Sequence, residues 1–169
     1  MPPPLPDGHA DPPTSPDWSW YLVGRPVFSG GNEVQLLRGG KDLFPAVAAA
    51  IHRARHEVWL ATYIFHIDTA TQPVLDALCA AARRGVRVRM VVDGFGTHQG
   101  LTALQQRLAD SGVALAVFRP LQRWTHWLQP GQLRRLHMKV CIVDGELGFV
   151  GGINLIDDHI DLHHGRSEQ

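Results

Sequence analysis

Apolar residues recur along this chain with two different spacings, and the alternation of those spacings predicts the fold. Between residues 41 and 54 the apolar positions are 43, 44, 47, 48 and 51, which is the spacing of one helix face. Residues 57–65 (EVWLATYIF) form a nearly continuous apolar run instead, typical of a strand that is covered on both faces. The same two signals predict further helices over 74–84 and 101–111, and further strands over 33–37, 86–93 and 113–118.

Turn-forming residues separate these predicted elements. Gly39-Gly40 ends the first strand, Pro73 stands at a helix start, and Gly85 and Gly112 stand at helix ends. Strand and helix therefore alternate, which requires crossover connections between parallel strands. We predict an α/β domain with a mixed, largely parallel sheet layered by helices.

A hairpin is predicted in the last quarter of the sequence. Apolar runs at 138–143 and 147–150 flank Asp144-Gly145, and an Asp-Gly pair between such runs favours a two-residue type I′ turn. That turn would pair Val143 with Glu146, Lys139 with Val150 and His137 with Gly152. The hairpin would supply the antiparallel part of the mixed sheet.

The hairpin would also gather polar groups at its open end. Side chains alternate along a strand, so His137 and Lys139 share one face. The returning strand brings Gly151, Gly152 and Asn154 to the level of this pair. An imidazole, a cation, an amide side chain and glycine N–H groups at one place indicate a site that handles phosphate.

These residues carry a resemblance to a known family. His137-x-Lys139-x4-Asp144, followed by Gly151-Gly152-x-Asn154, resembles the HKD motif of the phospholipase D superfamily with its trailing G-(G/S)-x-N. Residues 32–164 look most like bacterial cardiolipin synthases, through EVQLLRGGKDLFPAVAAAI, EVWLATYIF, VRVRMVVDGFGT and FVGGINLIDDH. The resemblance implies one phospholipase D-like lobe, most similar to the N-terminal lobe of such an enzyme.

The resemblance also implies a mechanism. His137 would attack phosphorus and form a phosphohistidine intermediate, while Lys139, Asn154 and the Gly151-Gly152 backbone hold the phosphoryl oxygens. Asp144 would support the site from behind. The implied substrate is a phospholipid at a membrane surface, and the implied reaction transfers a phosphatidyl group to a hydroxyl of another lipid or of glycerol. We expect no metal and no cofactor.

In one respect the sequence departs from the family pattern. It carries one HKD motif, whereas full-length members of this type carry two HKD lobes. We therefore expect a second HKD lobe as a partner, either in a homodimer or in a missing C-terminal half, and slightly favour the fragment. Two alternatives stay open: a phosphodiesterase or nuclease that acts as a dimer, and an inactive N-terminal fragment that binds lipid or a partner chain.

Composition adds limits on partners and location. Sixteen basic residues balance sixteen acidic ones, so no net charge favours nucleic acid, which we do not expect as a partner. The sequence shows no signal peptide and no apolar run long enough to span a membrane, so we expect a peripheral protein at the cytoplasmic face of the cell membrane. We predict a disordered proline-rich leader over 1–17, a packing or interfacial segment over 18–31, and the lobe over 32–169.

Other patterns are less specific. Gly94, Gly96 and Gly100 miss the dinucleotide-binding spacing and favour a loop that lets a substrate approach the strand ends. Residues 118–135 interleave Arg and Trp, which suits a packed surface loop, a membrane-interface flap or a surface that stacks bases. Asp and His residues between 157 and 164 lack regular metal-ligand spacing, and Cys141 is expected to pack with a raised pKa rather than to react.

Overall fold

The computed structural model describes residues 30–120 and 135–157. The predicted leader, most of the 18–31 segment, the Arg-Trp stretch over 121–134 and the Asp-His tail from 158 onward lie outside the described residues. All described helices and strands belong to one compact unit, Leu36–Gln169. Among the described residues, no helix combines the length and the apolar character needed to cross a lipid bilayer.

A five-stranded mixed sheet forms the centre of this unit. Its strands are β1 (Glu57–Thr62), β2 (Arg87–Asp93), β3 (Ala114–Phe118), β4 (Val140–Val143) and β5 (Leu147–Val150), in the order β3-β2-β1-β4-β5. β1 pairs in parallel with β2, and β2 with β3, whereas β4 is antiparallel to both β1 and β5. The predicted mixed, largely parallel sheet is therefore confirmed, with β4 alone running against the other four strands.

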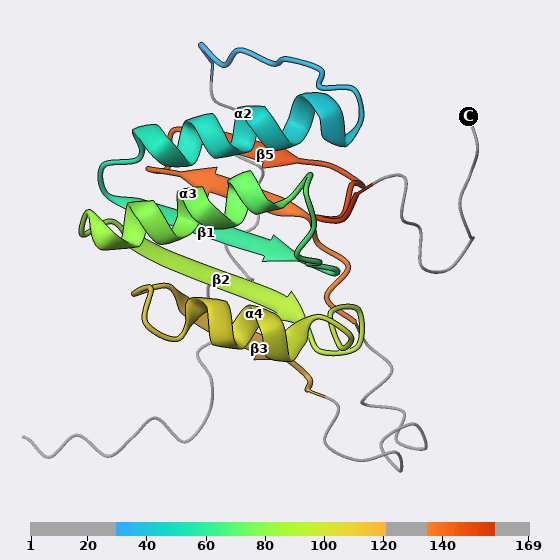
Figure 1. Ribbon diagram of the computed structural model, residues 1–169. Coiled ribbons are helices and arrows are strands. Elements are labelled where there is room, and N and C mark those ends of the chain that lie inside the picture. The colour runs from blue at the N-terminus through green and yellow to red at the C-terminus, as the bar shows by residue number, and fades with distance from the viewer. Residues whose placement is uncertain (1–29, 121–134, 158–169) are drawn as a thin grey trace, which may run out of the picture. The chain divides into compact units, whose positions relative to one another are not determined.

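Three helices, α2 (Gly39–Arg53), α3 (Gln72–Arg83) and α4 (Leu101–Leu108), lie on the same face of the sheet (Figure 1). Crossovers between parallel strands are right-handed, so two successive crossovers that step the same way along the sheet put their helices on one face. Val58, Leu60, Val88 and Met90 point into the core that the helices cover. Trp59, on the opposite face of β1, is 43% exposed.

The prediction of a strand over residues 33–37 is wrong. These residues form neither helix nor strand, and Val34 and Leu36 are 93% and 81% exposed. Gly39 and Gly40, expected to break a strand, are the first two residues of α2 instead. The alternating pattern of this segment is compatible with extended backbone, but a strand also needs a neighbour to complete its hydrogen-bond ladder.

The predicted hairpin exists, but its register is shifted by one residue. Val143 pairs with Leu147 and Val140 with Val150, not Val143 with Glu146. Asp144 and Gly145 have positive φ values of 53° and 70°, and the N–H of Glu146 donates to Val143 O at 3.1 Å. The turn is therefore built as expected, but Glu146 enters the loop before strand pairing resumes.

Candidate active site

The His137–Lys139 pair lies at the edge of the sheet where the parallel strands end. β4 runs against β1 and begins at Val140, so the residues just before it meet the carboxyl end of β1. Open α/β sheets bind their ligands at this edge. His137 is exposed, and its ring lies 5.5 Å from the ring of Tyr63, centroid to centroid.

Lys139 is held close to that histidine. Its residue surface is only 8% exposed, and its Nζ donates to the backbone oxygen of His137 at 3.3 Å. The same Nζ lies 5.4 Å from the centroid of the Tyr63 ring, a distance at which a cation is attracted to an aromatic face. Partial burial lowers the pKa of the Lys139 amine from its usual value, because the charged form loses water. The structure thus places a poorly exposed cation against the backbone of an exposed histidine, and both residues contact the Tyr63 ring.

Asn154 reaches the same region from the segment after β5. Its Oδ1 accepts the backbone N–H of Ile64 at 3.2 Å, and the following residue, Leu155, forms a parallel bridge with Phe65. These contacts tie the segment to the end of β1. The amide NH2 of Asn154 is the end that can donate to a ligand.

The two glycines of the motif differ in what their backbones do. The N–H of Gly151 donates to Lys139 O at 3.2 Å and so belongs to the hairpin ladder, whereas Gly152 lines a cavity beside Asn154. A Cβ at either position would meet no atom within 4 Å. Packing within the lobe therefore does not require glycine at these positions. A ligand that approaches the backbone closely would require it.

Asp144 lies at the opposite end of β4 from His137. Seven residues of extended chain correspond to about 23 Å at 3.3 Å per residue. Its carboxylate accepts the backbone N–H groups of Arg55, His56 and Glu57 at 2.8–2.9 Å, and these bonds lower its pKa to about 2. Asp144 therefore fixes the chain that enters β1 and does not reach the His137 end of the hairpin.

Asp93 has a positioning role that the sequence pattern did not reveal. This residue ends β2 and is fully buried. Its Oδ1 accepts the N–H groups of Phe95 and Gly96, and its Oδ2 accepts the N–H of Leu136 at 2.8 Å. Since Leu136 precedes His137, one carboxylate ties the loop after β2 to the histidine. An Asp-Gly step directly after an apolar strand was the available signal.

Tyr63 is the second residue that sequence reasoning missed, because it sits inside an apolar run. Burial raises the pKa of its hydroxyl, with a smaller contribution in the same direction from Asp93 and an opposing one from Arg135. Its backbone oxygen would lie 2.4 Å from a Cβ at Gly96. Tyr63 thus fills the space between the motif and the loop that follows β2.

Cys141 is buried on the helix-covered face, as expected. Desolvation raises the pKa of its thiol to about 12, so the thiolate that a nucleophile requires does not form near neutral pH. The predicted packing role is confirmed.

Comparisons with known proteins found a matching family model and similar sequences. The family model described as "Cardiolipin synthase, PLD-like domain" matches residues 47–164. The curated relatives include cardiolipin synthase B of Salmonella typhimurium, 33% identical over 82% of this chain and 33% of the relative, and cardiolipin synthase A of Pseudomonas putida, 36% identical over 83% and 29%. The chain thus spans about a third of the length of the curated relatives it matches.

Two solved structures share the fold. Nuc from Salmonella typhimurium, a phospholipase D family member, matches with a TM-score of 0.50 and 28% identity over 66% of this chain and 64% of its own. NucT from Helicobacter pylori matches with a TM-score of 0.54 and 20% identity over 69% of each chain.

Proposed function

The chain belongs to the phospholipase D-like family of cardiolipin synthase domains, and from that premise we propose that it carries one half of a phosphatidyltransferase site. The observation that supports this most is that His137 is exposed and that the Lys139 ammonium donates a hydrogen bond to its backbone oxygen. Asn154 accepts the N–H of Ile64 just after β1, and Gly152 and Asn154 line the same cavity. These groups are the nucleophile and the positive or polar partners that attack on a phosphodiester requires.

The reaction proceeds in two displacements at phosphorus. His137 attacks the phosphodiester, a nitrogen–phosphorus bond forms, and the bond to the leaving alcohol oxygen breaks. A histidine of the second lobe gives its proton to that oxygen. The acceptor hydroxyl then attacks phosphorus, returns a proton to the second-lobe histidine, and releases His137. Lys139 and the Asn154 amide stabilise the charge on the non-bridging oxygens in both steps.

A second HKD lobe is the partner that this reaction needs, because the described part of the chain holds one HKD histidine. A second copy of the chain or another segment of a longer protein supplies it. The substrate is a phospholipid, and the protein acts as a peripheral protein at the cytoplasmic face of the membrane.

Turnover of phosphatidylglycerol vesicles tests the proposal. The purified chain is incubated with vesicles and a chelator, and products are identified by mass. If a second copy supplies the second lobe, the wild-type chain forms cardiolipin or phosphatidic acid and His137→Ala forms neither. His52→Ala is the matched control, since His52 is also exposed but lies on α2. Equal turnover by His137→Ala would contradict the proposed role.

A phosphodiesterase acting as a dimer is the second candidate, favoured by the likeness to Nuc, which covers a similar share of both chains. It uses the same His137 and Lys139 with water as the acceptor. Parallel assays with phosphatidylglycerol vesicles and single-stranded DNA separate the two candidates. Cleavage of DNA without any lipid product would favour the second.

A further inference from the structure

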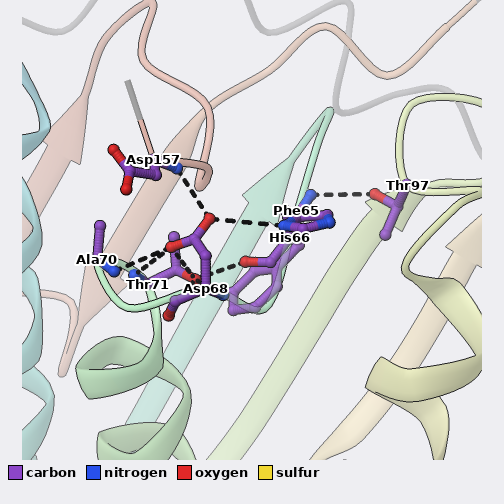
Figure 2. Close-up of polar contacts among 7 residues, drawn as sticks. All are labelled: Phe65, His66, Asp68, Ala70, Thr71, Thr97 and Asp157. Carbon is purple, nitrogen blue, oxygen red and sulfur yellow. Dashed lines mark hydrogen bonds and ion pairs between the residues drawn. The ribbon is translucent and has the colours of Figure 1, made fainter. Parts of the chain in front are cut away.

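An Asp–His pair lies next to the proposed site and takes no part in the mechanism above. His66 Nδ1 is 3.6 Å from Asp68 Oδ2, and the two side chains are 31% and 6% exposed (Figure 2). Nδ1 itself is shielded from water and has no hydrogen-bond partner among the described residues. The distance between these two atoms exceeds the length of a hydrogen bond by less than 1 Å. Hydrogen bonds between catalytic groups are often long in the absence of ligand and shorten when a ligand binds.

Asp68 is fixed far more firmly than an exposed carboxylate would be. Its Oδ1 accepts the N–H groups of Ala70 and Thr71 at 3.0 and 2.9 Å, and its Oδ2 accepts the N–H of Asp157 at 2.8 Å. The last bond joins the start of α3 to the chain beyond Asn154. Asp68 is therefore a firmly held carboxylate 3.6 Å from His66 Nδ1, placed to accept an N–H there once the contact shortens. Nε2 is then the polar ring atom left for a ligand.

Nε2 points away from Asp68, toward the loop that carries Thr97 (Figure 2). His66 lines a cavity of about 270 Å³ there, whose walls also include Asn154, Gly152 and His98. Ligand pockets for drug-sized molecules span roughly 300–1,000 Å³, so this cavity fits a small headgroup rather than a whole lipid. The same cavity is therefore lined by the imidazole and by two motif residues proposed to contact phosphate, Asn154 and Gly152.

We propose that this cavity binds a phosphorylated polyol, the glycerol phosphate unit of a phospholipid headgroup, and that Nε2 of His66 accepts a hydrogen bond from one of its hydroxyls. The inference rests on the proposed function, since it places the phosphate at Asn154 and Gly152. Asp68 is the positioning residue that holds the ring with Nδ1 protonated. His66 binds the hydroxyl without taking its proton.

Binding of soluble probes by the whole chain tests the assignment without requiring turnover. sn-Glycerol 3-phosphate and inorganic phosphate are titrated in parallel, and the 15N resonances of the histidine rings are followed by NMR. One net hydrogen bond corresponds to about fivefold in affinity, so the wild-type chain should bind glycerol phosphate about fivefold more tightly than phosphate. The His66 Nε2 resonance should move in the first titration.

Substitutions of His66 separate the two ring nitrogens. His66→Asn retains a donor near the Nδ1 position and removes Nε2, so the preference for glycerol phosphate should fall to about onefold. His66→Gln places its amide near the position of Nε2 and should keep part of the preference for glycerol phosphate. Neither change touches the backbone N–H of His66, which donates to Leu155 O at 2.8 Å. His52→Asn is the control on an exposed histidine of α2 and should behave as the wild type.

Three further measurements sharpen the outcome. Asp68→Asn should shift the ring tautomer of His66, which a merely structural role would not do. His98→Asn should have less effect than His66→Asn, because His98 is exposed and its Nδ1 contacts Phe95 O at 2.7 Å. Bicelles containing phosphatidylglycerol should move the same Nε2 resonance, which identifies the lipid headgroup rather than free glycerol phosphate as the source.

The proposal is overturned if His66→Asn keeps the wild-type preference for glycerol phosphate, or if His98→Asn abolishes that preference instead. An unchanged His66 tautomer in Asp68→Asn would overturn the positioning role of Asp68. A wild-type chain that binds neither probe at millimolar concentration also overturns it. Failure of the proposed function gives a different result. Vesicles are then not turned over, but the wild-type chain still prefers glycerol phosphate and His66→Asn still loses that preference.

Discussion

At the scale of single residues, two carboxylates hold the site in place without entering it. Asp93 ties the loop after β2 to Leu136, and Asp144 ties the hairpin turn to residues 55–57. Each connects segments that are more than forty residues apart in the sequence, as the hydrogen bonds to Leu136 and to Arg55 show. His137 is therefore positioned by backbone hydrogen bonds at both ends of β4, while its own ring stays accessible.

Replacing the Asp144 carboxylate should cost stability in a pH-dependent way. The pKa of Asp144 is about 2 in the folded chain and 3.8 ordinarily, so folding favours the charged form. Its contribution is present above about pH 4 and lost as the pH falls towards 2. Asp144→Asn, which tolerates the same positive φ, should lower the melting temperature at pH 7 and approach the wild type near pH 2. Circular dichroism melts across this range check the prediction, and equal melting temperatures at pH 7 would contradict it.

The thiols of the native chain should be unreactive. Cys141 has a pKa of about 12, and Cys79 is fully buried. Ellman's reagent at pH 8 should detect no thiol in the folded protein and both in urea. Rapid labelling of Cys141 without unfolding would show that its strand is not packed as described.

At the scale of elements, the loop between β2 and α4 depends on two glycines that leave room for neighbouring backbone. A Cβ at Gly96 would lie 2.4 Å from Tyr63 O, and one at Gly94 would lie 2.7 Å from Arg119 O. These contacts press the loop against the ends of β1 and β3. A loop is observed where it was predicted, but close backbone packing, rather than the expected approach of a substrate, accounts for Gly94 and Gly96.

Gly96→Ala should therefore disturb both the loop and the site. Overpacking of this kind costs about 1–3 kcal/mol, and the shift should move Tyr63 and reduce any turnover. Gly100→Ala is the matched control, because its Cβ would meet its nearest atom at 3.5 Å, an ordinary contact. Chemical denaturation of both variants checks the difference. Equal stability of the two would contradict the packing described for Gly96.

The sequence predicts the elements better than their connections. Helical and strand spacing placed α2, α3 and the parallel strands, because each buries a regular apolar face. The hairpin register was missed by one residue, because Glu146 joins Asp144 and Gly145 in the loop before strand pairing resumes. His137, Lys139 and Asn154 were found through a local motif. Asp93, Tyr63 and His66 were not, because only the folded chain brings them to the same edge.

At the scale of the whole molecule, the proposed mechanism takes the nucleophile from the described lobe and the proton for the leaving alcohol from a second lobe. Two substrates should therefore behave differently. Release of glycerol from phosphatidylglycerol needs that proton, so activity per chain should fall on dilution if a second copy supplies it. 4-Nitrophenolate leaves without a proton, so its first release from phosphatidyl-4-nitrophenol should be independent of chain concentration. A dilution series with both substrates checks this, and a parallel fall for both would contradict it.

The covalent step at His137 is the central claim, and a rapid-quench experiment tests it most directly. The chain is mixed with vesicles containing phosphatidyl-4-nitrophenol, nitrophenolate release is followed by absorbance, and alkaline-quenched peptides are analysed by mass. We expect a burst of about one nitrophenolate per chain and a phosphatidyl adduct on the peptide that contains His137, both absent in His137→Ala. No burst and no adduct, or a burst that persists in His137→Ala, would contradict the account.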